Sequence, residues 1–172
     1  MPNKVIHLWT DGSSINSGEN VGCGGHGYVL LYGDFTDVDL NTKYCDDSHT
    51  LTGWGSATDT TNQREEMKAL ISALKRIKNH DILITVFLDS AYVKNCMEQR
   101  WYDKWRLNGW KNSKKEPVAN KDLWEELIDI VESNMLFIKY VKVKSHTNVY
   151  YNELADQLAK KGLDEARYGV DE

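Results

Sequence analysis

The sequence predicts an α/β fold: a five-stranded mixed sheet, with its first three strands antiparallel, flanked by helices. Three strand-like stretches follow one another at the start of the chain with no helical pattern between them, which is typical of an antiparallel meander. Helical and strand-like stretches then alternate, and the apolar run at residues 82–88 has the length of a central strand covered on both faces. Together these observations predict one globular domain.

Composition narrows the class of protein. The chain has 172 residues, 41% hydrophobic and 27% charged, so it can form a proper core and shows no sign of disorder. Three cysteines without the spacing of a disulfide framework indicate reduced thiols, and the N-terminus lacks the pattern of a signal segment. No run approaches the roughly 18 apolar residues of a membrane span. We expect a cytoplasmic monomer that does not enter a membrane.

The first strand-like stretch, residues 4–14, is mostly apolar and β-branched until it reaches Asp11 and Gly12. This pattern predicts a buried strand whose end presents one carboxylate, with Gly12 letting another group approach the backbone closely. The alternative is an ordinary Asp-Gly turn.

Two further strands are expected at residues 21–32 and 50–57, and the polar, acidic connection covers residues 33–56. Two pairs in this region resemble zinc ligands: Cys23 with His26, and Cys45 with His49. Zinc is the weaker interpretation, because residues three apart in a strand point to opposite faces.

The first helix is expected over residues 62–79. Three residues able to cap it stand at its start: Thr60, Thr61 and Asn62. Its apolar stripe consists of Met67, Leu70, Ile71, Leu74 and Ile77. At about 100° per residue, Glu66 borders this stripe and Glu65 faces water on the opposite side. The alternative for both acids is a favourable interaction with the positive end of the helix dipole.

The apolar run at residues 82–88 ends in Asp89, and a helix is expected at residues 91–97. Asp89 therefore occupies the carboxyl end of a buried strand, where open α/β sheets place ligands. A helix-capping role for Asp89 or Ser90 is the alternative.

The last strand is expected at residues 135–143, and the final helix ends near Gly162. In that helix Asn152 and Asp156 are four residues apart and share a face, whereas Glu153 points away from the core stripe. Taken alone, Asp156 is an ordinary acid on a helix surface.

One shared explanation covers the four acids at the edges of apolar elements. If Asp11, Glu66, Asp89 and Asp156 gather, they repel one another and their pKa values rise unless cations hold them. Mg²⁺ is a hard cation that takes a few carboxylates, waters and a substrate phosphate, and Mn²⁺ is the alternative. Two such ions can clamp the attacking water and the leaving oxygen of a phosphodiester.

The segment from Lys94 to Lys121 is basic, with eight lysines and arginines against three acids, although the chain as a whole carries −5. This segment is therefore +5 and the remainder −10, which predicts one local surface for a polyanion. Four of the six tryptophans lie in or beside it: Trp101, Trp105, Trp110 and Trp124. We expect Trp105 and Trp124 to pack in the core, because Trp124 begins a helical stripe.

The order of the motifs resembles type 1 ribonuclease H over nearly the whole chain. The motifs are Thr10-Asp11-Gly12-Ser13, Thr61-Asn62-Gln63-Arg64-Glu65-Glu66, Leu88-Asp89-Ser90-Ala91-Tyr92-Val93, Gly109-Trp110-Lys111, Asp122-Leu123-Trp124, Val143-Lys144-Ser145-His146 and Asn152-Glu153-Leu154-Ala155-Asp156. The resemblance implies a ribonuclease H-like fold. It also implies an endonuclease that uses two metal ions to hydrolyse the RNA strand of RNA–DNA hybrids, leaving 3′-hydroxyl and 5′-phosphate ends.

The resemblance also assigns roles to residues. It implies that the four acids are the metal-binding catalytic carboxylates and that His146 assists proton transfer or product release. The implied substrate contacts are Gly12, Ser13, Thr61, Asn62, Gln63, Ser90, Trp101, Lys104, Lys111, Lys114, Lys115 and Asn152. A single domain is expected at residues 1–164, with a basic protrusion lying along the hybrid at about residues 98–120 and a C-terminal tail at 165–172.

Departures from the family pattern mark what the resemblance leaves open. Residues 33–56 are longer and more acidic than the usual hairpin, and Ser145 replaces the usual glycine before His146. Two other functions remain: an enzyme on the same fold acting on DNA, such as a transposase-like or junction nuclease, and a non-catalytic hybrid-binding module.

Overall fold

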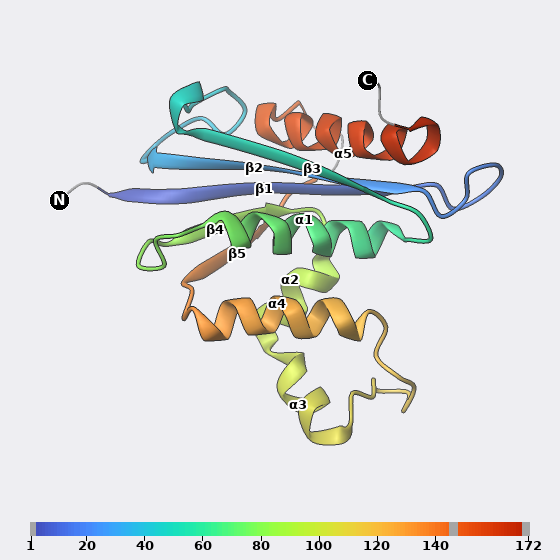
Figure 1. Ribbon diagram of the computed structural model, residues 1–172. Helices are drawn as coiled ribbons and strands as arrows, with labels where there is room; N and C mark the ends of the chain where they lie inside the picture. Colours follow the sequence, from blue (N-terminus) through green and yellow to red (C-terminus); the bar gives the residue numbers. More distant parts are fainter. Residues whose placement is uncertain (1–2, 145–147, 170–172) are drawn as a thin grey trace.

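The computed structural model describes residues 3–144 and 148–169 and confirms the predicted five-stranded mixed sheet. The strand order is β3-β2-β1-β4-β5, with β1–β2 and β2–β3 antiparallel and β1–β4 and β4–β5 parallel (Figure 1). The strands are β1 Lys4–Ser14, β2 Gly24–Asp34, β3 Thr50–Ala57, β4 Ile84–Leu88 and β5 Ile138–Lys142.

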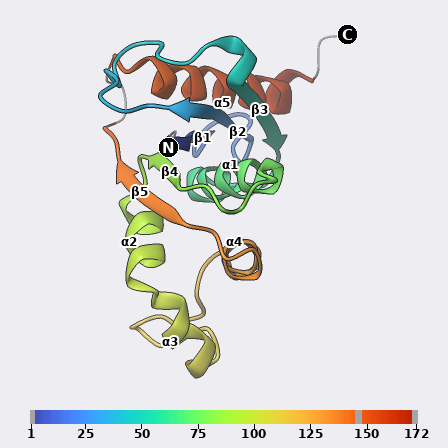
Figure 2. The ribbon, with the colours of Figure 1, turned by 90° about the vertical axis from the view of Figure 1, so that its left-hand side faces the viewer.

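Helices cover both faces of the sheet. Helix α5 lies across one face, α1 lies against the other, and α4 packs on the outer side of α1 (Figures 1 and 2). Helices α2 and α3 leave the sheet beside β5 and project away from it (Figure 2). The helices are α1 Asn62–Arg76, α2 Ala91–Gln99, α3 Trp101–Asn108, α4 Lys121–Ser133, α5 Tyr150–Tyr168 and the short 3₁₀ helix Asp47–His49. No helix within the described ranges is long and apolar enough to cross a membrane.

Each face of the sheet has its own core, and apolar burial of this kind is the main stabilising contribution to folding. The predicted stripe of α1 is buried there in full, from Met67 to Ile77. Trp105 and Trp124 are also buried in this core, as predicted, and Trp124 is fully inaccessible. The core under α5 is smaller and largely aromatic, with Trp9 stacked on Phe87 at 4.0 Å between ring centroids.

The first strand differs from its prediction in one respect that matters for the site. Asp11 does not end the strand, and no turn forms there, because β1 continues to Ser14. The three residues after Asp11 pair with the glycine-rich start of β2, and Gly12 stands opposite His26. Asp11 therefore lies inside a strand whose residues pair with β2 both before and after it in the sequence.

Most other boundaries shift by two or three residues, as helix and strand ends commonly do. The exception is the end of the last helix, which continues through Gly162 to Tyr168 and into the predicted C-terminal tail. Gly162 is an interior packing residue: a Cβ there would lie 2.1 Å from the carbonyl oxygen of Gly55 on β3. The glycine lets α5 lie close to the sheet and does not end the helix.

The acidic connection after β2 is anchored by its few apolar residues. The Tyr44 hydroxyl forms a hydrogen bond with the Nδ1 atom of His7 at 2.6 Å. The indole N–H of Trp9 donates to the same hydroxyl at 3.2 Å. The Tyr151 hydroxyl meets the backbone N–H and C=O of Cys45, both at 3.1 Å. The connection thus packs against the first turn of α5.

Candidate active site

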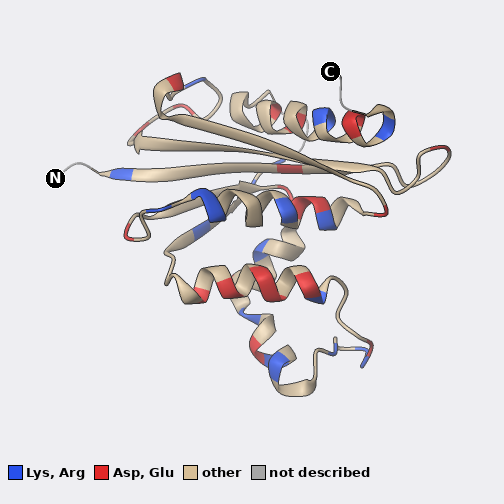
Figure 3. Ribbon diagram, viewed as in Figure 1, with Lys and Arg blue, Asp and Glu red and all other residues tan. Residues whose placement is uncertain are grey.

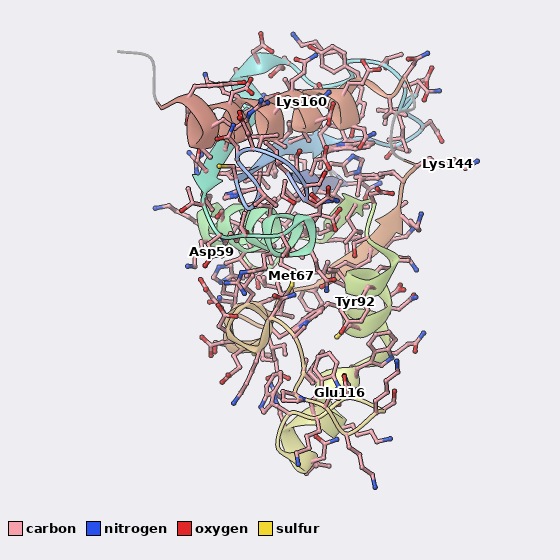
Figure 4. The ribbon with its side chains drawn as sticks, turned by 90° about the vertical axis from the view of Figure 1, so that its right-hand side faces the viewer. Asp59, Met67, Tyr92, Glu116, Lys144 and Lys160 are labelled. Carbon is pink, nitrogen blue, oxygen red and sulfur yellow. The ribbon has the colours of Figure 1, made fainter. Side chains whose placement is uncertain are left out.

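Four predicted carboxylates from four different elements line one cleft of about 580 Å³. Asp11 comes from β1, Glu66 from α1 and Asp156 from α5, while Asp89 follows β4 directly. Figure 4 looks toward this end of the molecule, with Lys160 marking α5 above, Met67 marking α1 in the middle and Tyr92 marking α2 below. The four acids that the sequence selected are therefore neighbours in space.

The sheet itself sets Asp11 beside Asp89. In the parallel pairing of β1 with β4, Trp9 stands next to Phe87. Asp11 and Asp89 each stand two residues beyond this last pair, and both line the cleft.

Gly12 brings Glu66 to this pair. A Cβ on Gly12 would lie 2.4 Å from the backbone nitrogen of Glu66 and 2.7 Å from the carbonyl carbon of Glu65. Only a glycine leaves room for the first turn of α1 to rest on β1 so closely. Ser14 reinforces the contact by donating from Oγ to the Asn62 side-chain oxygen at 2.7 Å.

The cleft disfavours negative charge. Burial, together with a hydrogen bond to the neighbouring Asp156, raises the pKa of Asp11 to about 7. Burial and the charge of Asp89 raise the pKa of Glu66 to about 7. Two carboxyls that hold their protons near neutrality form a site that gains strongly from a bound cation.

Two lysines supply part of that positive charge. The Lys160 ammonium lies 2.9 Å from the Asp156 carboxylate, and Lys142 lies 3.9 Å from that of Asp89. Both lysines are half-exposed, so these ion pairs are weak and can separate. Asp11 and Glu66 have no such ion pair among the described residues.

The donor set fits magnesium. All four groups are hard carboxylate oxygens, which Mg²⁺ prefers, and the deprotonated acids would be stabilised by its charge. As placed within the described ranges, no three or more His, Cys, Asp or Glu side chains form a group that could hold a metal ion. Mg²⁺ needs only one or two carboxylates from a protein, because it retains waters and is completed by substrate phosphates.

The prediction that Glu65 faces water is wrong. Its side chain is fully buried, with Oε1 3.1 Å from His26 Nδ1 and Oε2 accepting from Thr60 Oγ1 at 2.8 Å and Lys68 Nζ at 2.9 Å. The helical stripe did not predict this burial because it marks only one covered face of α1. The first turn of α1 also packs against β1 and β2, where Glu65 lies. His26 is therefore a partner of Glu65 and is not directed at Cys23.

The predicted substrate contacts divide into three groups. Gly12, Ser13, Asn62 and Asn152 line the cleft. Thr61 and Ser90 cap α1 and α2, accepting from Arg64 N at 3.2 Å and Val93 N at 3.1 Å, and Gln63 is half-buried in the first turn of α1. The third group, Trp101, Lys104, Lys111, Lys114 and Lys115, lies on the protrusion. Sequence reasoning missed other cleft residues, which carry no distinctive pattern: Ser14, Glu153, Gln157 and Lys160.

The protrusion has a basic groove of about 660 Å³, between α3 and the loop that follows it. We call it the basic groove, and its lining includes Tyr92, Arg100, Trp101, Lys104, Lys111 and Lys115. Figure 3 shows basic positions on α3 and the loop that follows it, below the largely acidic helix α4. Arg100 and Arg106 are neutralised by Asp103 and Glu132. By contrast, Lys104, Lys111, Lys114 and Lys115 have no ion pair within 4.0 Å in the described part of the chain.

His146 lies outside the described residues, so its predicted role stays a prediction. The Asn152 side chain, which lines the cleft, donates to the Lys144 carbonyl oxygen at 3.4 Å.

Comparison with known proteins agrees with the geometry. Residues 3–164 match the family model described as RNase H. The chain is 43% identical to a ribonuclease H of Syntrophomonas wolfei, over 93% of this chain and 97% of that protein.

Solved structures share the fold. One is a type 1 RNase H with the type 2 active-site motif, LC9-RNase H1, with a TM-score of 0.72 and 23% identity, covering 100% of this chain and 79% of that one. Another is LC11-RNase H1 in complex with an RNA/DNA hybrid, with a TM-score of 0.61 and 21% identity, covering 94% and 98%. On the family match and the identity to its relatives, the chain belongs to the ribonuclease H family.

Proposed function

We propose that this protein is a divalent-metal-dependent endonuclease that hydrolyses the RNA strand of RNA–DNA hybrids. The observation that carries the proposal is the convergence of Asp11, Glu66, Asp89 and Asp156 on one open cleft, where two carboxyls hold pKa values of about 7. Membership of the ribonuclease H family and the hybrid bound by LC11-RNase H1 support this choice of substrate.

Asp11, Glu66, Asp89 and Asp156 would hold two Mg²⁺ ions together with the substrate phosphate, and Mn²⁺ is the alternative. When bound, these ions would supply an activated water and charge stabilisation for the leaving oxygen. Water adds to phosphorus, the bond from phosphorus to the 3′ oxygen breaks, and that oxygen takes a proton. The products carry a 3′-hydroxyl and a 5′-phosphate.

The residues around the acids would orient the hybrid. Ser13, Asn62 and Asn152 line the cleft and offer hydrogen bonds to the RNA strand, whose 2′-hydroxyls distinguish it from DNA. The basic groove would hold the other strand through phosphate contacts from its lysines and an aromatic contact from Trp101. We also assign residues 1–164 to one functional domain acting as a monomer.

A cleavage assay tests the proposal. A hybrid with a labelled RNA strand is incubated with Mg²⁺ and, separately, with chelator, beside duplex DNA and duplex RNA. We expect cutting of the RNA strand in the hybrid, only with Mg²⁺, and none where deoxynucleotides replace the ribonucleotides at the scissile phosphate. Efficient cleavage of duplex DNA would favour the transposase-like alternative, and binding without cleavage would favour a non-catalytic module.

A further inference from the structure

The Glu65 carboxylate is an unusual group to find fully buried. Burying a charge is costly unless hydrogen bonds and opposite charges compensate it. Here three donors from three parts of the chain do so: His26 on β2, Thr60 in the loop before α1, and Lys68 one turn further along α1. The carboxylate only accepts, so the His26 Nδ1 atom carries the proton toward it.

Glycines clear the space for this arrangement. A Cβ on Gly24 would lie 2.5 Å from the Thr60 methyl carbon and 3.0 Å from the Glu65 Cγ. A Cβ on Gly55 would lie 2.4 Å from the His26 ring. Neighbouring positions of β2 and β3 thus lack side chains where this buried network needs room.

Two neighbouring strands contact the same part of the first turn of α1. The backbone between Glu65 and Glu66 rests on Gly12, next to Asp11. On the adjacent strand β2, His26 pairs with Gly12 and holds the Glu65 side chain through its Nδ1 atom. A displaced Glu65 would therefore displace the residue that follows it in the chain.

We propose that Glu65 is a positioning residue for Glu66. Its buried carboxylate, held by His26, Thr60 and Lys68, locks the first turn of α1 and directs the Glu66 carboxylate toward Asp11 and Asp89. The inference rests on the proposed function for its consequence in catalysis, while its structural part concerns cation binding alone.

A simple role with the helix dipole does not explain these observations. An acid in the first turn already interacts favourably with the dipole while exposed, so a dipole role requires neither full burial nor three side-chain donors. Three side-chain donors, one of them the Lys68 ammonium, lie within hydrogen-bond distance of the two Glu65 carboxylate oxygens. The charged form is thus the one that the network holds.

The test compares Glu65→Gln and Thr60→Val with the control Ile128→Val. Glu65→Gln removes the charge, whereas Thr60→Val keeps that charge and removes one hydrogen bond, so it remains informative if the first variant does not fold. Ile128 is buried on α4 and lies outside the cleft, so its loss of a methyl group lowers the thermal midpoint by about 2–4 °C and leaves the site intact.

Calorimetric titration of the whole protein with Mg²⁺ alone is measured beside steady-state cleavage of the hybrid. We expect Glu65→Gln to bind Mg²⁺ about tenfold more weakly and to lose about 10- to 100-fold in kcat with KM unchanged, because small misplacement of a reacting group is costly. Thr60→Val should show a smaller loss in the same direction, and Ile128→Val neither.

Opposite results separate the two claims. If Glu65→Gln and Thr60→Val lower the thermal midpoint like Ile128→Val but keep wild-type Mg²⁺ affinity and kcat, Glu65 is only structural and the inference is overturned. If the wild type binds Mg²⁺ but cleaves no hybrid, the proposed function fails, while the Mg²⁺ affinities still decide the role of Glu65. A wild type that binds no Mg²⁺ would overturn both.

Discussion

The cleft and the basic groove are built on opposite electrostatic principles. In the cleft, carboxylates from four elements are gathered with too little positive charge, and two of them have pKa values of about 7. In the basic groove, the arginines are neutralised within the protein, and the lysines remain exposed for an external anion. The cleft therefore favours bound cations, whereas the basic groove favours a bound polyanion.

The comparison predicts that the two regions control different kinetic constants. The largest effect is expected from Asp89→Asn, which keeps the shape of the side chain but removes a charge that would hold the metal. Hybrid cleavage in Mg²⁺ should fall to near background, with the fold retained in circular dichroism. Turnover like that of the wild type would show that the cleft is not the catalytic site.

The next largest effect is expected from Gly12→Ala. The added methyl would lie 2.4 Å from the backbone of Glu66, so α1 must move away from β1. We expect kcat to fall about 100-fold, since misplacement of this order is enough. Gly109→Ala is the matched control for losing a glycine, because nothing lies within 4 Å of its Cβ position, although its φ of 77° adds strain. If Gly12→Ala loses no more kcat than this control, the close approach of α1 is not required.

The basic groove should respond through KM. Replacing Lys111, Lys114 and Lys115 by Gln should raise KM about tenfold, leave kcat near its original value, and flatten the log–log salt dependence of affinity by up to roughly one unit per lost contact. Trp101→Ala should weaken affinity with little change in slope, because an aromatic contact releases no counterion. Identical slopes for the wild type and the triple variant would show that the groove does not hold the hybrid.

The last prediction concerns stability without metal and leaves activity aside. The pKa of Asp11 is about 7 in the folded protein and near 4 when unfolded, so folding is favoured while the folded carboxyl keeps its proton. The contribution of Asp11 to the free energy of unfolding falls as the pH rises from about 4 to 7, by up to about 4 kcal/mol at 1.36 kcal/mol per pKa unit. Asp11→Asn removes this loss. In urea unfolding with chelator present, the free energy of unfolding of the variant should therefore exceed that of the wild type by an amount that grows from pH 4 to pH 7. A constant difference would contradict the raised pKa.

Much of this architecture could be predicted from local pattern. The stripe of α1 and the apolar run of β4 depend on periodicity, and periodicity decides which residues a helix or strand buries. The four acids could be selected because each stands at the edge of an apolar element, and the family resemblance ordered them. Thr61 was one of three candidate caps of α1, and Ser90 one of two candidate caps of α2, for the same local reason.

The parts that were missed depend on contacts between distant residues. The His26 partner of Glu65 is 39 positions away in the sequence. The apolar stripe of a helix marks one buried face and does not predict that a second face is also covered. Gly162 resembles a helix end in sequence, and only its contact with Gly55 shows that it lies inside the helix. The anchoring of the acidic connection depends on Tyr44 and Tyr151, whose pairing leaves no sequence pattern.

The most direct test of this account is a ¹³C NMR titration of the side-chain carboxyls, with Asp11 and Glu66 assigned through Asn and Gln variants. In chelator, these two carboxyls should titrate with midpoints near 7. Saturating Mg²⁺ should lower both midpoints by several units, because the bound cation favours the ionised form. Midpoints below 5 in chelator, or midpoints near 7 that Mg²⁺ leaves unchanged, would contradict the claim that the cleft is a cation site.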